Sequence, residues 1–520
     1  MLSTQTKKER LNMKHIYITT PIYYPNSDPH IGTAYTTIIA DFLSRYYKMK
    51  NYKVFFLTGN DENSIKVEEA AQKLGLKPKE YVDKMAELFK QIWSKLDIQY
   101  DKFIRTTDEY HVKTASYVFD KLHKESYIYK GDYEGWYCKS CETFWTKSKV
   151  GQDKLCPNTE CRKPLQWIKE DNYFFKLSYF QEKLIKFYEE NPDTIFPKTR
   201  YNEILSFIKS GLQDISVSRK NLEWGIKVPF DKNYTIYVWI DALTNYISAL
   251  GYPENFMMDY WENTYHIMGK DIIRFHAVIW PSILMALNLP LPKKIIAHGW
   301  LTTPSNEKIS KSKGGDMFNL KEFVFNNPPY MIMALRYYLL REGSFGDDIP
   351  VSVERFVQIY NSELANNLGN LVSRVVTLIQ KNLDNKVIKK QEISEVFNLA
   401  QETENDFNKL IENLEFSKAI EVILNFSSYL NKMIEEKKPW ELKNDKEKLN
   451  DILFELSYGI LVISKLIYPV MPQISIKILN QLGLKKVELD RINFELEDID
   501  SLEIQYKEIL FPTIKEYSTK

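Results

Sequence analysis

Two residues whose chemistry suits a phosphate group, His30 and Gly32, stand at the expected start of a helix. Backbone amides at a helix N-terminus lack helical partners, and the helix dipole adds positive charge there, so such an end binds anions. Gly32 would let a ligand approach the backbone closely, and His30 can donate a hydrogen bond to a phosphoryl oxygen. A histidine that only caps a helix fits the same residues, so this segment alone does not define a function.

A second group of charged residues lies far downstream, in the run 308–315 with the sequence KISKSKGG. Lys308 and Lys311 are mobile point charges that suit a triphosphate, and they stabilise it most as charge develops at the reacting phosphorus. The glycines that follow permit the loop to move. A solvated lysine loop is the plain alternative. The chain contains no G-x-x-x-x-G-K-[ST] sequence, which excludes a P-loop nucleotidase.

The four cysteines of the chain form two close pairs, Cys138 with Cys141 and Cys156 with Cys161. Four thiolates on two short turns satisfy tetrahedral zinc, whereas a cytosolic protein would not keep them as disulfides. Neither pair contains a histidine or an open ligand position, so we expect a structural zinc that takes no part in the chemistry. Scattered buried thiols are the alternative.

Strand-then-helix units must position these groups. Alternating apolar residues over 14–20 and an apolar run over 54–57 predict two strands, and the runs 234–240, 266–268 and 294–297 predict three more. Repeated units of this kind predict an α/β fold with a doubly wound parallel sheet of the Rossmann type. Its ligands are expected at the carboxyl ends of the strands.

The pattern changes twice along the chain, which predicts an inserted segment and a separate helical domain. The expected boundaries are a disordered tail over 1–12, the first half of the catalytic sheet over 13–128, the connective insertion with its zinc knuckles over 129–220, the second half of the sheet over 221–305, the lysine loop and a connecting segment over 306–354, and an all-α helical bundle over 355–520. Met13 is an alternative start, which would remove the tail.

Together, in this order and on these elements, the two phosphate-binding segments resemble the HIGH and KMSKS motifs of class I aminoacyl-tRNA synthetases. The resemblance extends over nearly the whole chain to the methionyl-tRNA synthetase family. The runs 19–26 (TTPIYYPN), 237–243 (YVWIDAL) and 269–272 (GKDI) are similar to that family's, and the cysteines lie where the family carries its zinc-bearing segment. The resemblance implies ATP with Mg²⁺, formation of methionyl-adenylate with release of pyrophosphate, and transfer to the terminal adenosine of tRNA(Met).

The expected amino-acid pocket is apolar and aromatic, because a thioether is apolar and polarizable. Ile272, His276 and Trp280 recur at i, i+4 and i+8, so they share one face of a helix. By resemblance, six further residues complete this methionine-binding pocket: Ile22, Tyr24, Trp239, Ala242, Leu243 and Tyr246. Asp61, just past the strand that ends at Gly59, would hold the substrate ammonium. Core packing is the alternative for each aromatic side chain.

The resemblance also implies the residues that bind ATP. It places His30 and Gly32 at the phosphates, Asp271 at the ribose, His298 beside the adenine, and Lys308 and Lys311 on the transition state. Thr33 and Gly269 are further expected ATP-binding residues. Of these, His30, Lys308 and Lys311 are the expected catalytic residues. A helix N-terminal acid is the alternative for Asp271.

In the helical domain, the run 361–374 resembles the family's anticodon-binding helix. Asn370 and Arg374 are four residues apart, hence on one face, and can hydrogen-bond the edges of unstacked bases. Trp440 could stack on a base, a contact worth about 1–3 kcal/mol. A helix salt bridge for Arg374 and a core position for Trp440 are the alternatives.

Two positions depart from the family's pattern. Thr33 replaces the commoner second histidine of the first motif, and Asn63 stands where the family usually has a histidine. These departures motivate one alternative, a catalytically silent tRNA-binding paralogue. A class I synthetase for another apolar amino acid is the other, although the insertion is too short for the large editing domain that such enzymes usually carry.

Composition narrows the remaining possibilities. The 70 basic and 69 acidic residues nearly cancel, so RNA contacts must come from local patches. The apolar run 459–470 is too short to span a bilayer and the N-terminus lacks a signal sequence, so we expect a cytoplasmic protein. The chain ends soon after Pro512, without the appended tRNA-binding domain that dimerises many relatives, which predicts a monomer.

Overall fold

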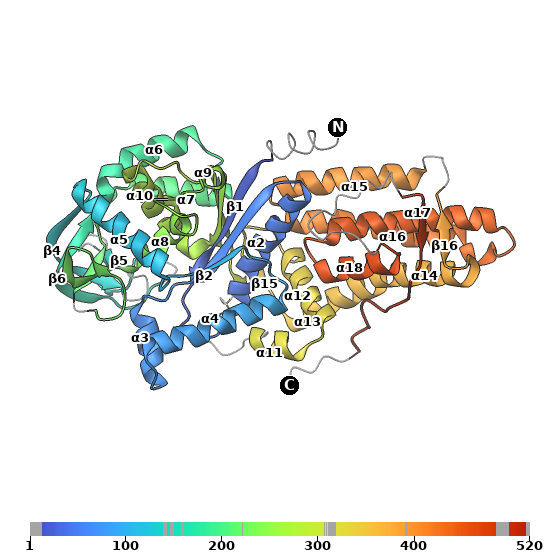
Figure 1. Cartoon of the computed structure of the whole chain (residues 1–520), viewed down its shortest axis with the longest axis horizontal. Helices are drawn as coiled ribbons and strands as arrows, with labels where there is room; N and C mark the ends of the chain where they lie inside the picture. The colour runs from blue at the N-terminus through green and yellow to red at the C-terminus, as the bar shows by residue number, and fades with distance from the viewer. Residues whose placement is uncertain are drawn as a thin grey trace.

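The computed structural model describes residues 13–138, 143–145, 150–157, 161–220, 222–305, 307, 309, 319–389, 394–484 and 499–515. The expected tail 1–12, Cys141, Lys308 and Lys311 lie outside the described residues. Figure 1 shows an elongated molecule, with strands and helices mixed at one end and a bundle of long helices at the other. The predicted fold class, a Rossmann-type sheet with a cysteine-bearing insertion and a helical domain, is confirmed.

Six parallel strands form the main sheet, in the order β3-β2-β1-β12-β13-β7. They are β1 (His15–Tyr23), β2 (Lys53–Asn60), β3 (Lys102–Arg105), β7 (Ile195–Phe196), β12 (Thr264–Gly269) and β13 (Lys294–His298). The chain runs outward from β1 to β3 and returns on the other side of β1, where β12 pairs with it in parallel. The carboxyl ends of β1 and β12 therefore flank the switch point of the sheet, which is where ligands bind in such folds.

Helices cover the main sheet. They are α2 (Ile31–Met49), α4 (Pro78–Lys95), α5 (Glu109–Lys124), α8 (Val238–Ser248), α9 (Met258–Trp261) and α10 (Trp280–Ala286), whereas α3 (Ile65–Lys73) packs against α4 and projects from the sheet (Figure 1). Helix α2 is buried along most of its length, so its apolar face is wide, and Ile38, Phe42 and Leu43 are each at most 1% exposed. Helix α2 is thus fixed against the sheet, and its N-terminus faces the carboxyl end of β1.

The insertion contains a separate antiparallel sheet, in the order β5-β4-β6-β8. Its strands are β4 (Ile128–Cys138), β5 (Thr143–Trp145), β6 (Gln166–Phe175) and β8 (Ile215–Ser216). Between β6 and β8 the chain forms α6 (Gln181–Glu190) and α7 (Lys198–Lys209), which pack against each other, and α7 also packs against β7. Within the range 129–220, however, β7 pairs with β13 and so extends the main sheet. A strand of two residues has no periodicity that sequence reading could detect.

The run 234–240 differs from its prediction as a strand of the main sheet. Its first residues belong to β11 (Asp231–Ile236), which pairs with β9 (Ser218–Lys220) and β10 (Lys227–Val228) in a small antiparallel sheet, and helix α8 begins at Val238. A continuous apolar run does not distinguish a buried strand from a buried helix, so periodicity could not place this boundary.

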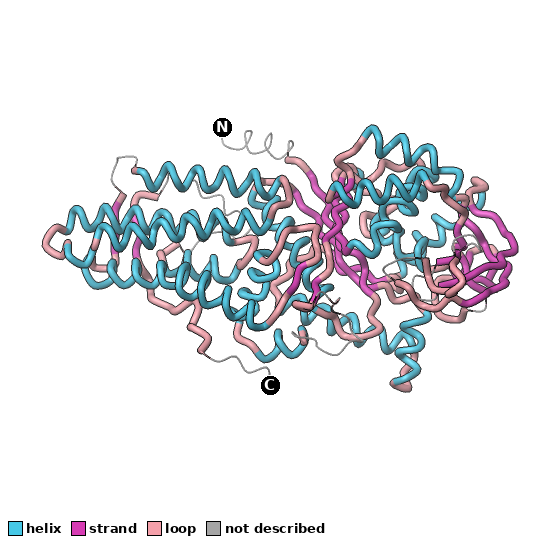
Figure 2. The backbone as a smooth tube through the Cα atoms, turned by 180° about the vertical axis from the view of Figure 1, so that it is seen from behind, coloured by secondary structure: helices cyan, strands magenta, loops and turns pink. Residues whose placement is uncertain are grey.

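The second half of the chain is almost entirely helical. Its elements are β14 (Leu301–Thr302), α11 (Leu320–Asn326), α12 (Pro329–Arg341), β15 (Ile349–Pro350), α13 (Val353–Ile359), the π-helical η5 (Tyr360–Gly369), α14 (Asn370–Asn382), β16 (Lys386–Ile388), α15 (Glu395–Glu412), α16 (Phe416–Lys437), α17 (Lys446–Ile467), α18 (Pro472–Gln481) and β17 (Ser501–Glu503). Seen from behind, the main sheet crosses the middle of the molecule between this bundle and the insertion (Figure 2). Among the described helices, none has the length and apolarity to cross a membrane.

A buried arginine joins the helical bundle to the catalytic region. Arg336 on α12 is fully buried and donates to Asp41 Oδ2 on α2 at 2.6 Å. It also donates to the carbonyl oxygens of Leu96 and Val470, both at 3.0 Å, and the latter lies between α17 and α18. Asp41 also accepts a hydrogen bond from Arg45 at 2.8 Å. Burial alone would raise the pKa of Asp41, but the two guanidinium groups lower it, so the carboxylate is charged.

Arg336→Met is therefore expected to lower the free energy of unfolding by about 3–5 kcal/mol, because it removes one partner of a buried charge. The matched control is Arg355→Met, which breaks the more exposed pair with Glu342 and should cost at most about 1 kcal/mol. Urea unfolding of the two variants measures the difference. Equal losses in both would show that the buried ion pair contributes no more to stability than the exposed one.

Candidate active site

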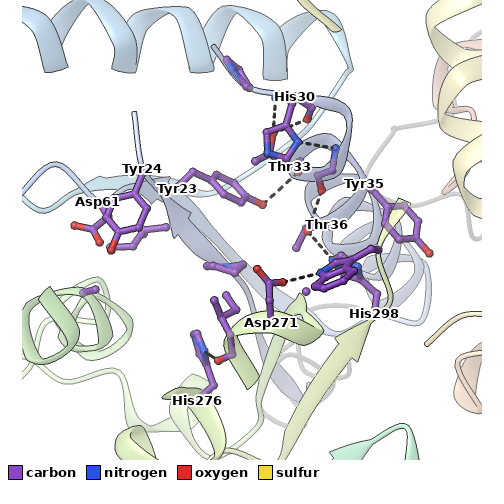
Figure 3. A pocket seen from close by; sticks show the side chains of 18 of the residues that line it. Tyr23, Tyr24, His30, Thr33, Tyr35, Thr36, Asp61, Asp271, His276 and His298 are labelled. Carbon is purple, nitrogen blue, oxygen red and sulfur yellow. Dashed lines mark hydrogen bonds between the residues drawn. The ribbon is translucent and has the colours of Figure 1, made fainter. Parts of the chain in front are cut away.

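A cavity of about 540 Å³ opens at the carboxyl ends of β1, β12 and β13, which is a usual size for a small-molecule site. Fifteen predicted site residues line it: Ile22, Tyr24, His30, Gly32, Thr33, Asp61, Trp239, Ala242, Leu243, Tyr246, Gly269, Asp271, Ile272, His276 and His298. Tyr24 and Asp61 lie on one side of the cavity, and Asp271 and His298 lie on the other (Figure 3). The cavity therefore has two distinct ends, with His30 above the space between them.

His30 caps helix α2, with its side chain turned to the backbone. Its Nδ1 accepts from the Gly32 amide at 3.0 Å, so the proton of the neutral ring is on Nε2, which can donate to an anion. A Cβ at Gly32 would lie 2.9 Å from His30 Cε1, so a larger residue here would displace the imidazole from its capping position. Thr33 Oγ1 donates to the His30 carbonyl at 2.6 Å and accepts from the His30 amide at 3.0 Å. Thr33 thus completes the cap, and its hydroxyl proton points to the backbone.

The side of the cavity near His298 is held by residues that sequence reading missed. Thr36 donates to His298 Nε2 at 2.7 Å, because His298 Nδ1 donates to the Gly299 carbonyl at 2.7 Å. The edge of the Tyr35 ring packs against the same imidazole at 4.8 Å between centroids. Thr36 lies one turn after Gly32 on the same face of α2, and this spacing could have indicated it.

Asp271 is exposed at the rim and is oriented by an indole. Trp300 Nε1 donates to its Oδ1 at 3.3 Å, and Lys270 lies 4.1 Å from the centroid of the Trp300 ring. A Cβ at Gly269 would come within 2.7 Å of Asp271 Oδ1, so glycine makes room for the carboxylate. A carboxylate oriented in this way can accept hydrogen bonds from the hydroxyls of a ribose. Trp300 was not predicted, although it closely follows His298 in the sequence.

The other end of the cavity has a neutral aromatic wall. His276 Nδ1 donates to the Ile272 carbonyl at 3.0 Å, and its Nε2 accepts from the Tyr246 hydroxyl at 2.7 Å. Burial lowers the pKa of His276 to about 4, so the imidazole is uncharged at neutral pH. Trp239 stacks on Phe275 with 3.4 Å between centroids and 11° between planes. An apolar, polarizable side chain fits such a wall.

Trp280 does not line the cavity that the described residues form, unlike Ile272 and His276. The predicted regular helix is interrupted by a 3₁₀ turn, η3 (Lys270–Ile272), and a π-helical turn, η4 (Phe275–Ile279). A π turn adds a residue, which rotates the later side chains away from the face that simple spacing predicts. Trp280 is instead buried behind the wall and donates to His266 Nε2 at 3.2 Å.

Asp61 is the carboxylate at this aromatic end. It is 3% exposed, and its amide donates to the Tyr23 carbonyl at 2.9 Å, which ties the residue after β2 to the end of β1. Nearby, the side-chain amide of Asn63 donates to Asp241 Oδ2 at 2.9 Å and to the Thr106 carbonyl at 3.1 Å. Asn63 therefore anchors the loop that carries Asp61, and an acid in an aromatic pocket suits a primary ammonium.

The low pKa of His276 predicts a loss of stability in acid. An unfolded histidine binds a proton below about pH 6.5, whereas buried His276 resists until about pH 4. Between these pH values the unfolded state therefore binds more protons than the folded state. His276 alone should then lower the free energy of unfolding by about 2 kcal/mol when the pH falls from 7 to 5. Urea unfolding at both pH values checks this, and His276→Gln should remove that share. An unchanged pH dependence in the variant would contradict it.

The described cysteines converge in the insertion. The sulfur atoms of Cys138, Cys156 and Cys161 lie within 4.8 Å of one another, and the first two residues are buried. Thiolates so arranged fit a zinc ion. Cys156 also donates its amide to the Lys163 carbonyl at 2.8 Å, so the turn after Cys161 is fixed to the cluster. Lys163 is among the residues lining the cavity that sequence reading missed, and no local pattern indicates it.

In the helical bundle, two of the three predicted anticodon residues meet. The Arg374 guanidinium lies 6.0 Å from the Trp440 ring centroid and pairs with Glu435 at 2.6 Å. Trp440 is 37% exposed, so its indole is not a core residue, and Asn370 is exposed at the start of α14. The Arg374 salt bridge that we considered as an alternative is thus present, and it holds the guanidinium beside the indole.

Comparisons with known proteins agree with this arrangement. Residues 16–376 match the family model "tRNA synthetases class I (M)", and residues 394–509 match "Anticodon-binding domain of tRNA ligase". The chain is 46% identical over 514 residues to the methionine–tRNA ligase of Caldanaerobacter subterraneus and 44% identical over 493 residues to that of Clostridium tetani. These matches cover 96% and 93% of this chain and 79% and 76% of the relatives. The methionyl-tRNA synthetase of Mycobacterium tuberculosis, solved with methionyl-adenylate, is similar with a TM-score of 0.89 and 34% identity, over 96% of this chain and all of that one.

Proposed function

This chain belongs to the methionyl-tRNA synthetase family of class I tRNA ligases, and on that premise we propose how its cavity carries out the reaction. It is a methionine–tRNA ligase, which joins methionine to tRNA at the expense of ATP. Methionine occupies the aromatic end, with its thioether against Tyr246 and His276 and its ammonium on Asp61. ATP occupies the other end, with its ribose on Asp271 and its adenine beside His298.

In the first step, a carboxylate oxygen of methionine attacks the α-phosphorus of ATP, and the bond from that phosphorus to the pyrophosphate oxygen breaks. Negative charge grows on the phosphoryl oxygens during this step. His30 Nε2–H and the amides at the start of α2 stabilise that charge, since they are oriented before the substrate arrives. Lys308 and Lys311 add cationic charge from the loop, and Mg²⁺ accompanies the ATP phosphates.

In the second step, a hydroxyl of the terminal adenosine of tRNA attacks the carbonyl carbon of methionyl-adenylate, and AMP leaves. In the helical bundle, Asn370, Arg374 and Trp440 bind the anticodon of tRNA(Met), through hydrogen bonds and stacking. A monomer and a cytosolic location stay predictions. Sedimentation velocity would check the first of them.

One observation supports this function most strongly. A buried carboxylate, Asp61, and a neutral aromatic wall share one cavity with the phosphate-binding start of α2. The test is the charging of tRNA(Met) with labelled methionine, compared with leucine, isoleucine and valine. Charging with methionine alone supports the proposal. Charging with another amino acid favours a different class I specificity, and no charging in folded protein favours a silent paralogue.

We also propose that Cys141 completes a structural zinc site with the three converging thiols, because four thiolates without an open position hold zinc without catalysis. Purified protein should then contain stoichiometric zinc. Cys156→Ser is expected to lose most of the metal, measured by metal analysis after gel filtration, because it replaces a thiolate with a weak ligand. Full retention of zinc in this variant would show that the metal is bound elsewhere.

A further inference from the structure

Two lysines that the proposed chemistry leaves unused, Lys66 and Lys163, line the cavity. They come from segments far apart in the sequence, one at the start of α3 and the other in the insertion beside the cysteines. Neither was predicted from the sequence.

Lys66 is held near the aromatic end of the cavity. Its Nζ lies 5.0 Å from the centroid of the Tyr24 ring, and Tyr24 is beside Asp61 (Figure 3). Lys66 also stands in the first turn of α3, which Ser64 caps. A cation at a helix N-terminus opposes the helix dipole, so α3 gains no stability from this charge. The position of Lys66 is better explained by what the cavity binds than by its own helix.

The backbone at Lys163 is fixed by the cysteine cluster. Its carbonyl accepts the Cys156 amide at 2.8 Å, and the next residue, Pro164, pairs with Leu155 in an isolated bridge. The neighbouring Arg162 is held by Asp153 at 2.8 Å. Lys163 is exposed, yet it lines the cavity, so the insertion extends to the mouth of the active site at this residue.

The charges of the three substrates indicate what these lysines bind. The ammonium of methionine is repelled by lysine and needs Asp61, whereas its carboxylate must lie at the α-phosphorus of ATP, which it attacks in the first step. The phosphates of ATP have their own site at the start of α2, which lies above the space between the two ends of the cavity. The remaining anion is tRNA, whose terminal adenosine must reach the carbonyl carbon of the adenylate.

We propose that Lys66 and Lys163 bind the phosphodiester groups next to the terminal adenosine of tRNA and so hold its 3′ end over the adenylate. This inference rests on the proposed function, but it concerns the transfer step alone. The two lysines are positioning residues, because they contact the backbone of the acceptor end and not the reacting atoms. Each lysine would neutralise one phosphate of the single-stranded 3′ end. The affinity of a protein for single-stranded RNA depends on such contacts and falls as the salt concentration rises.

The test is the double variant Lys66→Gln with Lys163→Gln. Methionine-dependent exchange between pyrophosphate and ATP should stay within about twofold of wild type, whereas kcat/KM for charging tRNA should fall about 5- to 30-fold, as for two exposed ion pairs. The matched control is Lys73→Gln with Lys154→Gln, which removes the same charge from α3 and from the cysteine segment. Both control lysines are exposed and lie outside the lining of the cavity.

A binding titration with intact tRNA and with tRNA lacking its terminal CCA locates the contact. Removal of CCA should weaken binding to wild type and to the control variant, but it should have little further effect on the Lys66, Lys163 double variant. The inference is overturned if charging by the two double variants is equal, if the loss persists without CCA, or if exchange falls as much as charging. Absence of exchange in wild type would instead overturn the proposed function.

Discussion

His30→Asn is expected to slow methionine-dependent exchange between pyrophosphate and ATP by about 10²- to 10³-fold in kcat, the usual effect of removing one oriented donor from a developing charge. Asparagine is a preferred N-cap residue, so its side-chain oxygen can still accept the Gly32 amide that His30 Nδ1 now accepts. The helix is thus preserved while the longer donor, Nε2–H, is lost. The variant separates the cap that the structure shows from the phosphate donor that we propose for the same imidazole.

The measurement is the exchange rate at saturating methionine and ATP, together with the free energy of unfolding. Unfolding should match wild type, and KM for methionine should change little. His30→Ala serves as the comparison, because it loses both the donor and the cap and should cost about 1 kcal/mol of stability besides. If the asparagine variant exchanges within a few fold of wild type, His30 only caps the helix.

Asp61→Asn is expected to lower kcat/KM for methionine by about 10²- to 10³-fold, because a buried carboxylate that pairs with an ammonium is replaced by a neutral amide, a loss of about 3–4 kcal/mol. The change preserves shape, and Asp61 is 3% exposed, so water cannot readily replace the lost charge. Most of the effect should appear in KM for methionine, with KM for ATP nearly unchanged.

Asp271→Asn is the matched control for this result. It makes the same chemical change at the other end of the cavity, where Asp271 is exposed and held by Trp300. It should raise KM for ATP and leave KM for methionine almost unaltered. If both variants raised the same constant, the assignment of the two ends of the cavity would be wrong.

Much of this site follows from the sequence because the relevant groups lie in the loops that follow strands. His30, Asp61 and Asp271 each follow a strand of a parallel sheet, and the carboxyl ends of such strands meet at one edge. Their places after these strands therefore predict that they meet in one cavity, whereas their individual roles come from the resemblance to the family. The start of helix α2 at His30 was predictable for a local reason, because residues next to it in the sequence form the cap.

Other features could not be read from the sequence because tertiary contacts decide them. Trp280 shares a helical face with His276 only in a regular helix, and the π turn between them breaks that spacing. Lys163 lines the cavity because the insertion reaches the mouth of the cavity at this residue, which no local pattern records. The strand β7 is too short to show a period and is defined by its pairing with β13.

Thr33 and Asn63 illustrate a third case, in which a departure from the family's pattern is visible in the sequence but its effect is not. In the structure, each side chain donates within the protein, Thr33 to the His30 carbonyl and Asn63 to Asp241. Both therefore support segments that carry residues to which we assign substrate contacts. Neither departure removes a group that the proposed chemistry requires.

The most direct test of the central claim is amino-acid-dependent exchange between pyrophosphate and ATP in purified, zinc-loaded protein. This assay measures the first step without tRNA, so its result depends only on how the cavity binds and activates the amino acid. We predict exchange with methionine far above that with leucine, isoleucine or valine, since only methionine combines an unbranched thioether with an ammonium for Asp61. Folded protein that supports no exchange with methionine would contradict the account.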